Sequence, residues 1–329
     1  MDQPRTTASI AAIGGYVPPD ILDNKQLEKT LDTSDAWITS RTGIKERRIL
    51  SDSTLATSDM AAYAIKDLLG NYRVKREDIQ CLILATSTPD HLLNPAASLV
   101  CEKAGLSNAW GFDLNAACSG FLYALSVGAG LIESNRYTKV LVVGADKMSA
   151  IVDYSDRNSC ILFGDGAGVV LLEANKEGYG IQESIFKTDG KGAKYLSVPA
   201  GGALLPASVQ TLAAKQHFLH QDGKTVFKQA VQHMSGSCQD IMQKASLTAD
   251  DVDWVIPHQA NLRIIKAVSA EIKVDISKFK INIDRYGNTT AATIPLCLWD
   301  FKKDFKRGDN IILTAFGAGF TWGSTYIKW

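Results

Sequence analysis

Residues 112–137, FDLNAACSGFLYALSVGAGLIESNRY, join a strand-like start to a run of small residues and then to a long, mostly apolar helix pattern. The helix pattern begins near Cys118. At a helix N-terminus the unpaired amides and the positive end of the dipole favour a thiolate, so this setting predicts a lowered pKa and a nucleophile. The neighbouring small residues leave room for a substrate to reach the sulfur. The alternative, a buried inert cysteine, is retained for Cys81, Cys101, Cys160, Cys238 and Cys297.

The surrounding chain alternates short apolar runs with helix-length amphipathic segments. That alternation predicts buried strands in an α/β protein. The runs are CLILAT (81–86), KVLVVGA (139–145), GVVLLEA (168–174), WVIPH (254–258) and NIILTAF (310–316).

A weak internal repeat suggests that the chain is duplicated. EDIQCLIL (77–84) resembles DDVDWVIP (250–257), and KVLVVGAD (139–146) resembles NIILTAFG (310–317). Between these pairs, GFDLNAACSG (111–120) resembles NIDRYGNTT (282–290), which aligns Asn288 with Ala117 and predicts a strand before Asn288. The repeat predicts two halves, residues 1–174 with the nucleophile and residues 175–329 with its partners.

Two polar residues of the second half are the predicted partners of Cys118. His258 ends an apolar run, and Asn288 follows a glycine in IDRYGNTTAATIPL. Reactive groups in α/β proteins collect where strands end. Thiol proteases use the same three residue types. Here, however, both partners come from the second half and could converge as two hydrogen-bond donors, which suits an enolate oxygen.

Composition excludes several classes of protein. The chain has 329 residues, 46% of them hydrophobic, and its 35 basic and 35 acidic residues cancel, so no global field favours nucleic acid or an anionic membrane. The cysteines show no zinc-ligand spacing, so no metal is expected. The N-terminus lacks signal-peptide features and no apolar run is long enough to span a membrane, which predicts a cytoplasmic protein.

Longer motifs carry a family resemblance. With Cys118 in DLNAACSGF, His258 in PHQANLR, Asn288 in DRYGNTT and the ending AFGAGFTWGS, the sequence resembles β-ketoacyl-acyl carrier protein synthase III. The match covers nearly the whole chain and includes SDAWITSRTGIKERR (34–48), FGDGAGVVLLEA (163–174) and DGKTVFKQAV (222–231). The glycines of FGDGAG are interpreted as a turn between strands. The resemblance implies a five-layered αβαβα thiolase-like fold with two pseudo-duplicated halves, in a homodimer.

The resemblance also implies a mechanism. Cys118 accepts the acyl group of an acyl-coenzyme A primer, acetyl or short and branched. His258 and Asn288 then hydrogen-bond the thioester carbonyl of malonyl-acyl carrier protein during decarboxylation, and the carbanion attacks the acyl-cysteine. The backbone amides of Cys118 and Ala318 hold the oxyanion. Acyl-coenzyme A is a substrate, and no cofactor is expected.

Further positions are assigned by the resemblance alone. The coenzyme A site comprises Thr33, Trp37, Arg41, Arg157, Lys224, Asn261 and Arg263. Asn94 stands before Pro95 where many relatives have an aromatic residue that reaches across the dimer into the partner's acyl pocket, so the acyl preference differs or stays open. Positions that are basic in some relatives and hold the carrier protein are Ala270 and Glu271 here.

Four other functions remain open. They are a starter enzyme of a specialised polyketide or quinolone pathway, an acyltransferase that loads Cys118 without condensing, a non-catalytic acyl-binding member of the fold, and a hydrolase. The presence of both His258 and Asn288 favours decarboxylative condensation, because two converging donors suit an enolate oxygen.

Overall fold

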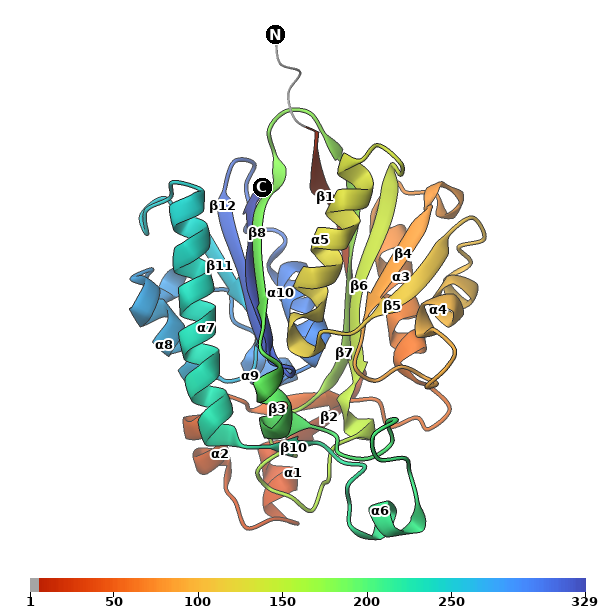
Figure 1. Cartoon of the computed structure of the whole chain (residues 1–329), viewed down its shortest axis with the longest axis vertical. Helices are drawn as coiled ribbons and strands as arrows, with labels where there is room; N and C mark the ends of the chain where they lie inside the picture. Colours follow the sequence, from red (N-terminus) through yellow and green to blue (C-terminus); the bar gives the residue numbers. More distant parts are fainter. Residues whose placement is uncertain (1–5) are drawn as a thin grey trace.

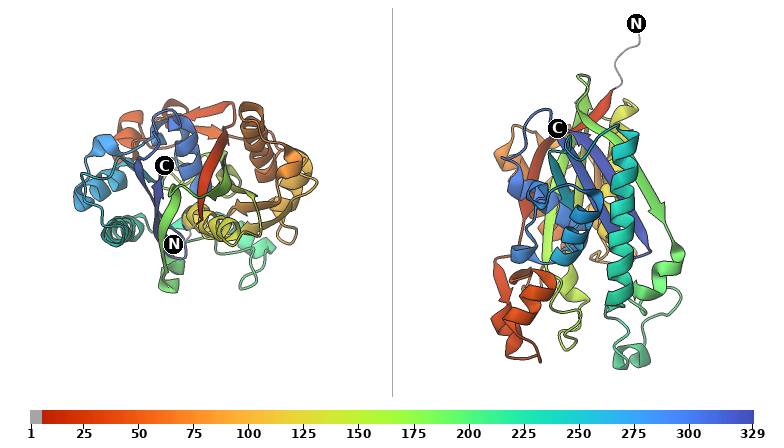
Figure 2. Two further views of the ribbon diagram at one scale, coloured as in Figure 1. Left: turned by 90° about the horizontal axis from the view of Figure 1, so that it is seen from above. Right: turned by 90° about the vertical axis from the view of Figure 1, so that its left-hand side faces the viewer.

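The computed structural model describes residues 6–329. Two β-sheets alternate with three helical layers (Figures 1 and 2). The first sheet has the strand order β1-β7-β6-β4-β5, with bounds β1 Thr7–Tyr16, β7 Asp165–Asn175, β6 Lys139–Lys147, β4 Cys81–Ala85 and β5 Trp110–Leu114. The second has the order β11-β12-β13-β8, with bounds β11 Trp254–Pro257, β12 Asn310–Gly317, β13 Thr321–Lys328 and β8 Gly180–Thr188.

The two sheets repeat one arrangement. The order β1-β7-β6-β4 corresponds to β8-β13-β12-β11. In each of these sets of four strands the last two are parallel and the other neighbours are antiparallel. The edge strand β5 has no equivalent. Its predicted counterpart before Asn288 forms a short helix instead, α9 (Ile283–Tyr286), so the prediction of a strand there is wrong. The boundary between residues 174 and 175 stays a prediction.

Helices α5 (Gly120–Glu133) and α10 (Thr293–Phe301) form the middle layer between the sheets (Figure 1). Their apolar side chains pack against strands of both sheets in one continuous core, for example Leu125 and Leu298 with Val142 of β6 and Leu313 of β12. Gly128 allows α5 to lie close to the first sheet, because a Cβ there would meet Leu172 and Val142 side chains at 2.9 Å. The two halves therefore share their core.

Outer helices cover the remaining sheet faces. On the first sheet lie α3 (Thr57–Asn71) and α4 (Ala96–Ala104), and on the second lie α7 (Gly223–Lys244) and α8 (Leu262–Ile272) (Figure 1). The short elements outside the layers lie at one end of the molecule (Figure 1). They are β2 (Asp20–Asp23), α1 (Asn24–Glu28), α2 (Asp35–Thr42), β3 (Glu46–Ile49), β9 (Leu196–Ser197), α6 (Val209–Ala213) and β10 (His220–Gln221). No helix within residues 6–329 is long and apolar enough to cross a membrane.

All five apolar runs singled out in the sequence are strands, which confirms the α/β prediction. Complete burial of β4 residues explains why CLILA is apolar without alternation. The interpretation of FGDGAG as a turn is wrong, since β7 already begins at Asp165. Its glycines serve packing: a Cβ on Gly168 would meet Pro295 of α10 at 2.7 Å.

Candidate active site

A cavity of about 320 Å³ lies between the two halves. Its lining includes Cys118 and Asn115 from the first half and His258, Asn288 and Ala318 from the second. No lysine or arginine is among the described residues that line it. Most of the remaining wall is apolar, including Met148, Leu162, Phe163, Leu196, Val226, Phe227, Met234, Ile264 and Phe316. The cavity is thus an uncharged chamber with a few polar groups.

Cys118 lies in a single 3₁₀ turn, Ala117–Ser119, immediately before α5. The predicted position at a helix start is confirmed, but the predicted lowering of its pKa is not. Burial, together with the negative charge of Asp146, raises the pKa of the Cys118 thiol to about 12. No lysine or arginine among the described lining residues offsets this desolvation, which favours the protonated thiol over the thiolate.

His258 follows β11, and its backbone N–H donates to Thr314 O at 2.8 Å. The imidazole is only 3% exposed, and Nδ1 lies 2.7 Å from Thr293 Oγ1. Burial lowers the pKa of His258 to about 3, so the ring is neutral near pH 7. Nε2 is left for a ligand in the cavity.

Asn288 is held by its backbone on both sides. Its N–H donates to Leu162 O at 2.8 Å, and its carbonyl accepts from Gly164 N at 3.1 Å. The side-chain Oδ1 accepts from Thr290 N at 2.9 Å. That bond fixes the carboxamide plane and leaves Nδ2 as a donor.

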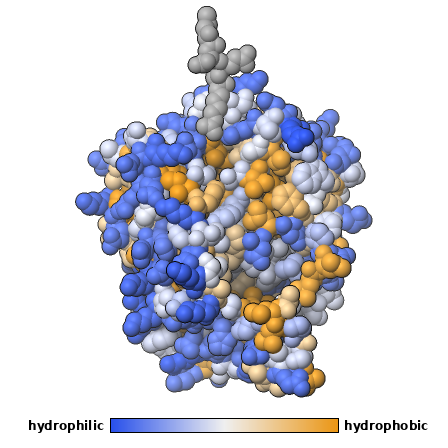
Figure 3. Space-filling model, viewed as in Figure 1, coloured by the Kyte–Doolittle hydropathy of each residue, from blue (hydrophilic) through white to orange (hydrophobic). Residues whose placement is uncertain are grey.

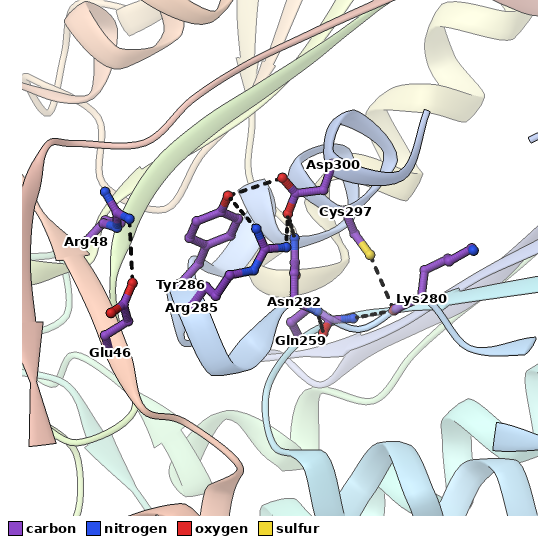
Figure 4. Close-up of polar contacts among 9 residues, drawn as sticks. All are labelled: Glu46, Arg48, Gln259, Lys280, Asn282, Arg285, Tyr286, Cys297 and Asp300. Carbon is purple, nitrogen blue, oxygen red and sulfur yellow. Dashed lines mark hydrogen bonds and ion pairs between the residues drawn. The ribbon is translucent and has the colours of Figure 1, made fainter. Parts of the chain in front are cut away.

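A buried network joins the segments that carry His258 and Asn288 (Figure 4). Gln259, next to His258, accepts from Asn282 N at 3.1 Å and donates to Lys280 O at 3.2 Å. Asn282 Nδ2 in turn donates to Asp300 Oδ2 at 2.8 Å, and Asp300 Oδ1 accepts from the hydroxyl of Tyr286 at 3.1 Å. Tyr286 ends α9, two residues before Asn288. The spacing of the two side chains therefore rests on a shared polar frame.

Ala318 follows β12 and lies beside Cys118. Gly317 brings this strand end against the backbone of Cys118, since a Cβ on Gly317 would lie 2.7 Å from Cys118 N. Within residues 6–329, neither the Cys118 nor the Ala318 N–H donates to a backbone carbonyl. Both amides are available to an oxyanion.

A second, outer chamber adjoins the cavity, and Asn261 and Phe227 line both. Its wall contains five of the seven predicted coenzyme A residues: Trp37, Arg41, Lys224, Asn261 and Arg263. Arg157 does not line it but places its guanidinium 5.5 Å from the ring centre of Trp37. Thr33 does not line it either, and its buried hydroxyl has no partner among the described residues. Figure 3 shows the face seen in Figure 1 as mainly hydrophilic, with apolar patches, one of them beside a hollow in its lower half.

Asn94 lies apart from both chambers in the single chain. It is exposed in the loop before α4, next to Leu92 and Leu93, each 91% exposed. Its predicted place in a partner's acyl pocket stays a prediction. Among residues 6–329 no cluster of His, Cys, Asp and Glu could hold a metal ion.

Sequence reasoning missed several polar residues of the site. Ser87 and Asn115 line the cavity, and Thr293 contacts His258 from behind. Asn115 carried a signal, because it stands three residues before the nucleophile as a polar residue among small and apolar ones. Nothing in the sequence marked Thr293, which looks like an ordinary residue at a helix start.

Comparison with known proteins gives consistent results over the whole chain. Models of the N- and C-terminal domains of 3-oxoacyl-[acyl-carrier-protein] synthase III match residues 112–190 and 242–329. The chain is 51% identical over 325 residues to the β-ketoacyl-[acyl-carrier-protein] synthase III of Phocaeicola vulgatus, covering 99% of this chain and 97% of the relative. It is 49% identical over 326 residues to that of Chlorobaculum tepidum, covering 98% and 99%.

Solved structures similar to this chain come from the same family as the sequence relatives. The synthase III of Thermus thermophilus superposes with a TM-score of 0.90 at 39% identity, covering 98% of this chain and 99% of that one. The synthase III of Aquifex aeolicus gives a TM-score of 0.90 at 38% identity, covering 98% and 100%. These structures share the layered fold, which confirms the predicted fold class.

Proposed function

The chain belongs to the β-ketoacyl-acyl carrier protein synthase III family, and we propose that the cavity between its sheets performs both half-reactions of a decarboxylative condensation. The enzyme is an acyltransferase that starts fatty-acid synthesis from an acyl-coenzyme A primer and malonyl-acyl carrier protein. One observation carries the assignment of its residues: Cys118, His258, Asn288 and Ala318 line a single uncharged cavity.

In the first half-reaction, the sulfur of Cys118 attacks the thioester carbonyl of the primer. A C–S bond to Cys118 forms, the C–S bond to coenzyme A breaks, and the thiol proton passes to the departing sulfur. The raised pKa of Cys118 requires that proton to leave as the attack proceeds. The N–H groups of Cys118 and Ala318 stabilise the oxyanion that develops on the carbonyl.

In the second half-reaction, malonyl-acyl carrier protein enters the cavity and loses carbon dioxide. The electron pair of the broken C–C bond moves onto the thioester as an enolate, whose oxygen accepts hydrogen bonds from Nε2 of His258 and Nδ2 of Asn288. The carbanion then attacks the acyl-Cys118 carbonyl, and the Cys118 sulfur departs as a thiolate that takes a proton from solvent to restore the thiol. An uncharged wall suits this step, because fixed donors act more strongly in a low-dielectric site than in water.

The outer chamber is the proposed coenzyme A site. Trp37 offers a flat surface for the adenine of coenzyme A, and the guanidinium groups of Arg41 and Arg157 beside it offer positive charge for the phosphates. Lys224 and Arg263 add further positive charge to the wall of this chamber. Acyl-coenzyme A is consumed as a substrate, so we propose no resident cofactor.

A homodimer is part of the proposal. Support comes from the exposed apolar side chains of Leu92 and Leu93 beside Asn94, since such groups on one loop mark contact surfaces. The acyl preference, the carrier-protein contact and a cytoplasmic location remain predictions.

The decisive experiment offers the protein a panel of acyl-coenzyme A primers with malonyl-acyl carrier protein, following acyl-enzyme mass and β-ketoacyl product. We expect a mass gain on Cys118 and a condensed product with acetyl or short branched primers, and neither with Cys118→Ala. Acylation without product would contradict the condensation, and no acylation by any primer would contradict the role of Cys118.

A further inference from the structure

One turn of the chain holds both proposed enolate donors. It comprises residues 290–293, where the 3₁₀ turn Thr290–Ala292 passes into α10. Thr290 N–H orients Asn288, at 2.9 Å from Oδ1. Thr293 Oγ1 contacts His258 at 2.7 Å from Nδ1. The same four residues therefore set the position of two side chains that lie 30 residues apart in the sequence.

Thr293 is the sole described partner of Nδ1, and it is 2% exposed. Its hydroxyl has one proton and two acceptors within reach, His258 Nδ1 and Thr290 O at 3.1 Å. Thr290 O already accepts from the backbone N–H of Thr293. The contact to Nδ1 is the shorter of the two, and a hydroxyl that donates there leaves Thr290 O with the Thr293 N–H that it already accepts, so this direction leaves no acceptor unsatisfied.

The direction of the hydrogen bond between Thr293 and His258 decides whether Nε2 presents an N–H donor or a lone pair to the cavity. If Thr293 donates to Nδ1, the single proton of the neutral imidazole resides on Nε2, and the ring presents a donor. If Nδ1–H donates to Thr293 instead, Nε2 presents a lone pair, which would repel an enolate oxygen. A neutral histidine takes its tautomer from the partner of its other nitrogen.

We propose that Thr293 is a positioning residue for condensation: its hydroxyl donates to Nδ1 of His258, keeps the ring proton on Nε2 and aims that N–H into the cavity. The proposal rests on the proposed function, in which His258 stabilises the enolate. Thr293 itself touches no reacting atom. Its effect is confined to the malonyl half-reaction, because transfer of the acyl group to Cys118 uses the two backbone amides.

The test separates the two half-reactions in Thr293→Val, which keeps the shape and removes the hydroxyl. We expect condensation to fall about 10- to 100-fold, by analogy with the loss of a residue that orients a metal-binding histidine, while Cys118 acylation stays within about threefold of the wild type. Thr293→Ser should restore condensation. Thr325→Val is the matched control, since it removes a buried hydroxyl that bonds Ser184 at 3.1 Å in the second sheet and does not line the cavity. Equal losses in both half-reactions, or no rescue by serine, would show a merely structural role.

A second measurement is made on the wild-type protein, and a variant is needed only to assign one signal. In protein labelled with ¹⁵N-histidine, the His258 signal, identified by its loss in His258→Ala, should show a protonated Nε2 and an unprotonated Nδ1. A proton on Nδ1 would overturn the proposal. Failure of the wild type to form acyl-enzyme or product would instead count against the proposed function, so the two failures are distinguishable.

Discussion

The carboxamides of Asn115 and Asn288 are held in the same way: Oδ1 of each accepts the backbone N–H two residues further on, at 3.1 Å and 2.9 Å. Both residues precede a 3₁₀ turn whose first residue has a positive φ, 47° at Ala117 and 53° at Thr290. The separations agree, since 288 − 115 = 173 and 290 − 117 = 173. The duplication thus places Asn288 opposite Asn115 and not opposite Ala117, as the sequence alignment predicted, and Ala291 stands where the first half has Cys118.

Replacement of Asn288 by alanine tests the enolate donor. We expect condensation to fall by about 10² to 10³, the usual effect of losing one such donor, because Nδ2 is lost from an otherwise intact cavity. Formation of acyl-Cys118 should continue at close to the wild-type rate. Rapid mixing with acyl-coenzyme A, followed by mass measurement, gives the first rate, and product formation gives the second. A matching loss in the acylation rate would argue against a role limited to malonyl chemistry.

Gly317→Ala tests the close approach of β12 to the nucleophile. The new Cβ would lie 2.7 Å from Cys118 N, so the strand end or the 3₁₀ turn has to move, and the two oxyanion amides lose their alignment. We expect acylation to slow at least about tenfold, as displaced donors lose part of their stabilisation. Gly202→Ala is the control, because a Cβ there meets no atom within 4 Å and should leave the acylation rate unchanged. Equal behaviour of the two variants would refute the argument.

Loss of cations from the outer chamber should weaken coenzyme A binding without altering the chemistry. In the double variant that combines Arg41→Ala and Lys224→Ala, we expect the KM for acyl-coenzyme A to rise about tenfold or more. Each exposed contact to phosphate contributes modestly to binding, so both cations are removed together. Turnover of an acyl-pantetheine thioester, which lacks the nucleotide, should not change. Lys176→Ala serves as control, because Lys176 is exposed in the β7–β8 connection at the end of the molecule away from α2. A raised KM in that control, or an equal loss with acyl-pantetheine, would contradict the assignment.

Burial of His258 predicts a pH dependence of stability. Its folded-state pKa, about 3, lies below the ordinary value of 6.5, so between these values the unfolded chain binds a proton that the folded chain excludes. The stabilisation of the folded chain that comes from burying a neutral His258 is complete above about pH 6.5 and declines as the pH falls toward 3. Asp146 acts in the opposite direction from about pH 6 to 3.8, because burial raises its pKa to about 6. The free energy of unfolding should therefore fall less on acidification in His258→Asn than in the wild type, as measured by urea titration at pH 7, 6, 5 and 4. Parallel curves would mean that His258 is not held neutral.

The sequence predicted the buried strands that it marked by apolar runs, and it singled out three residues that line one cavity. Apolar runs such as CLILA predict buried strands from their composition alone. Cys118, His258 and Asn288 stand out by residue type and position. Two errors have a common cause. The pKa of Cys118 depends on how far the folded chain excludes water, and the short helix α9 forms where the edge strand of the first half has no equivalent. Neither the pKa of Cys118 nor the formation of α9 is determined by neighbouring residues in the sequence. Thr293 was overlooked for the same reason, because its proposed role depends on a histidine 35 residues away.

The core shared by α5 and α10 makes the chain indivisible as a catalyst. A cut in the β7–β8 connection would separate Cys118 from His258 and Asn288. It would also leave the inner sheet face of each fragment only partly covered, because the middle layer draws one helix from each fragment. Turnover can consequently serve as a probe of integrity, since every active molecule has both sheets closed on the middle layer.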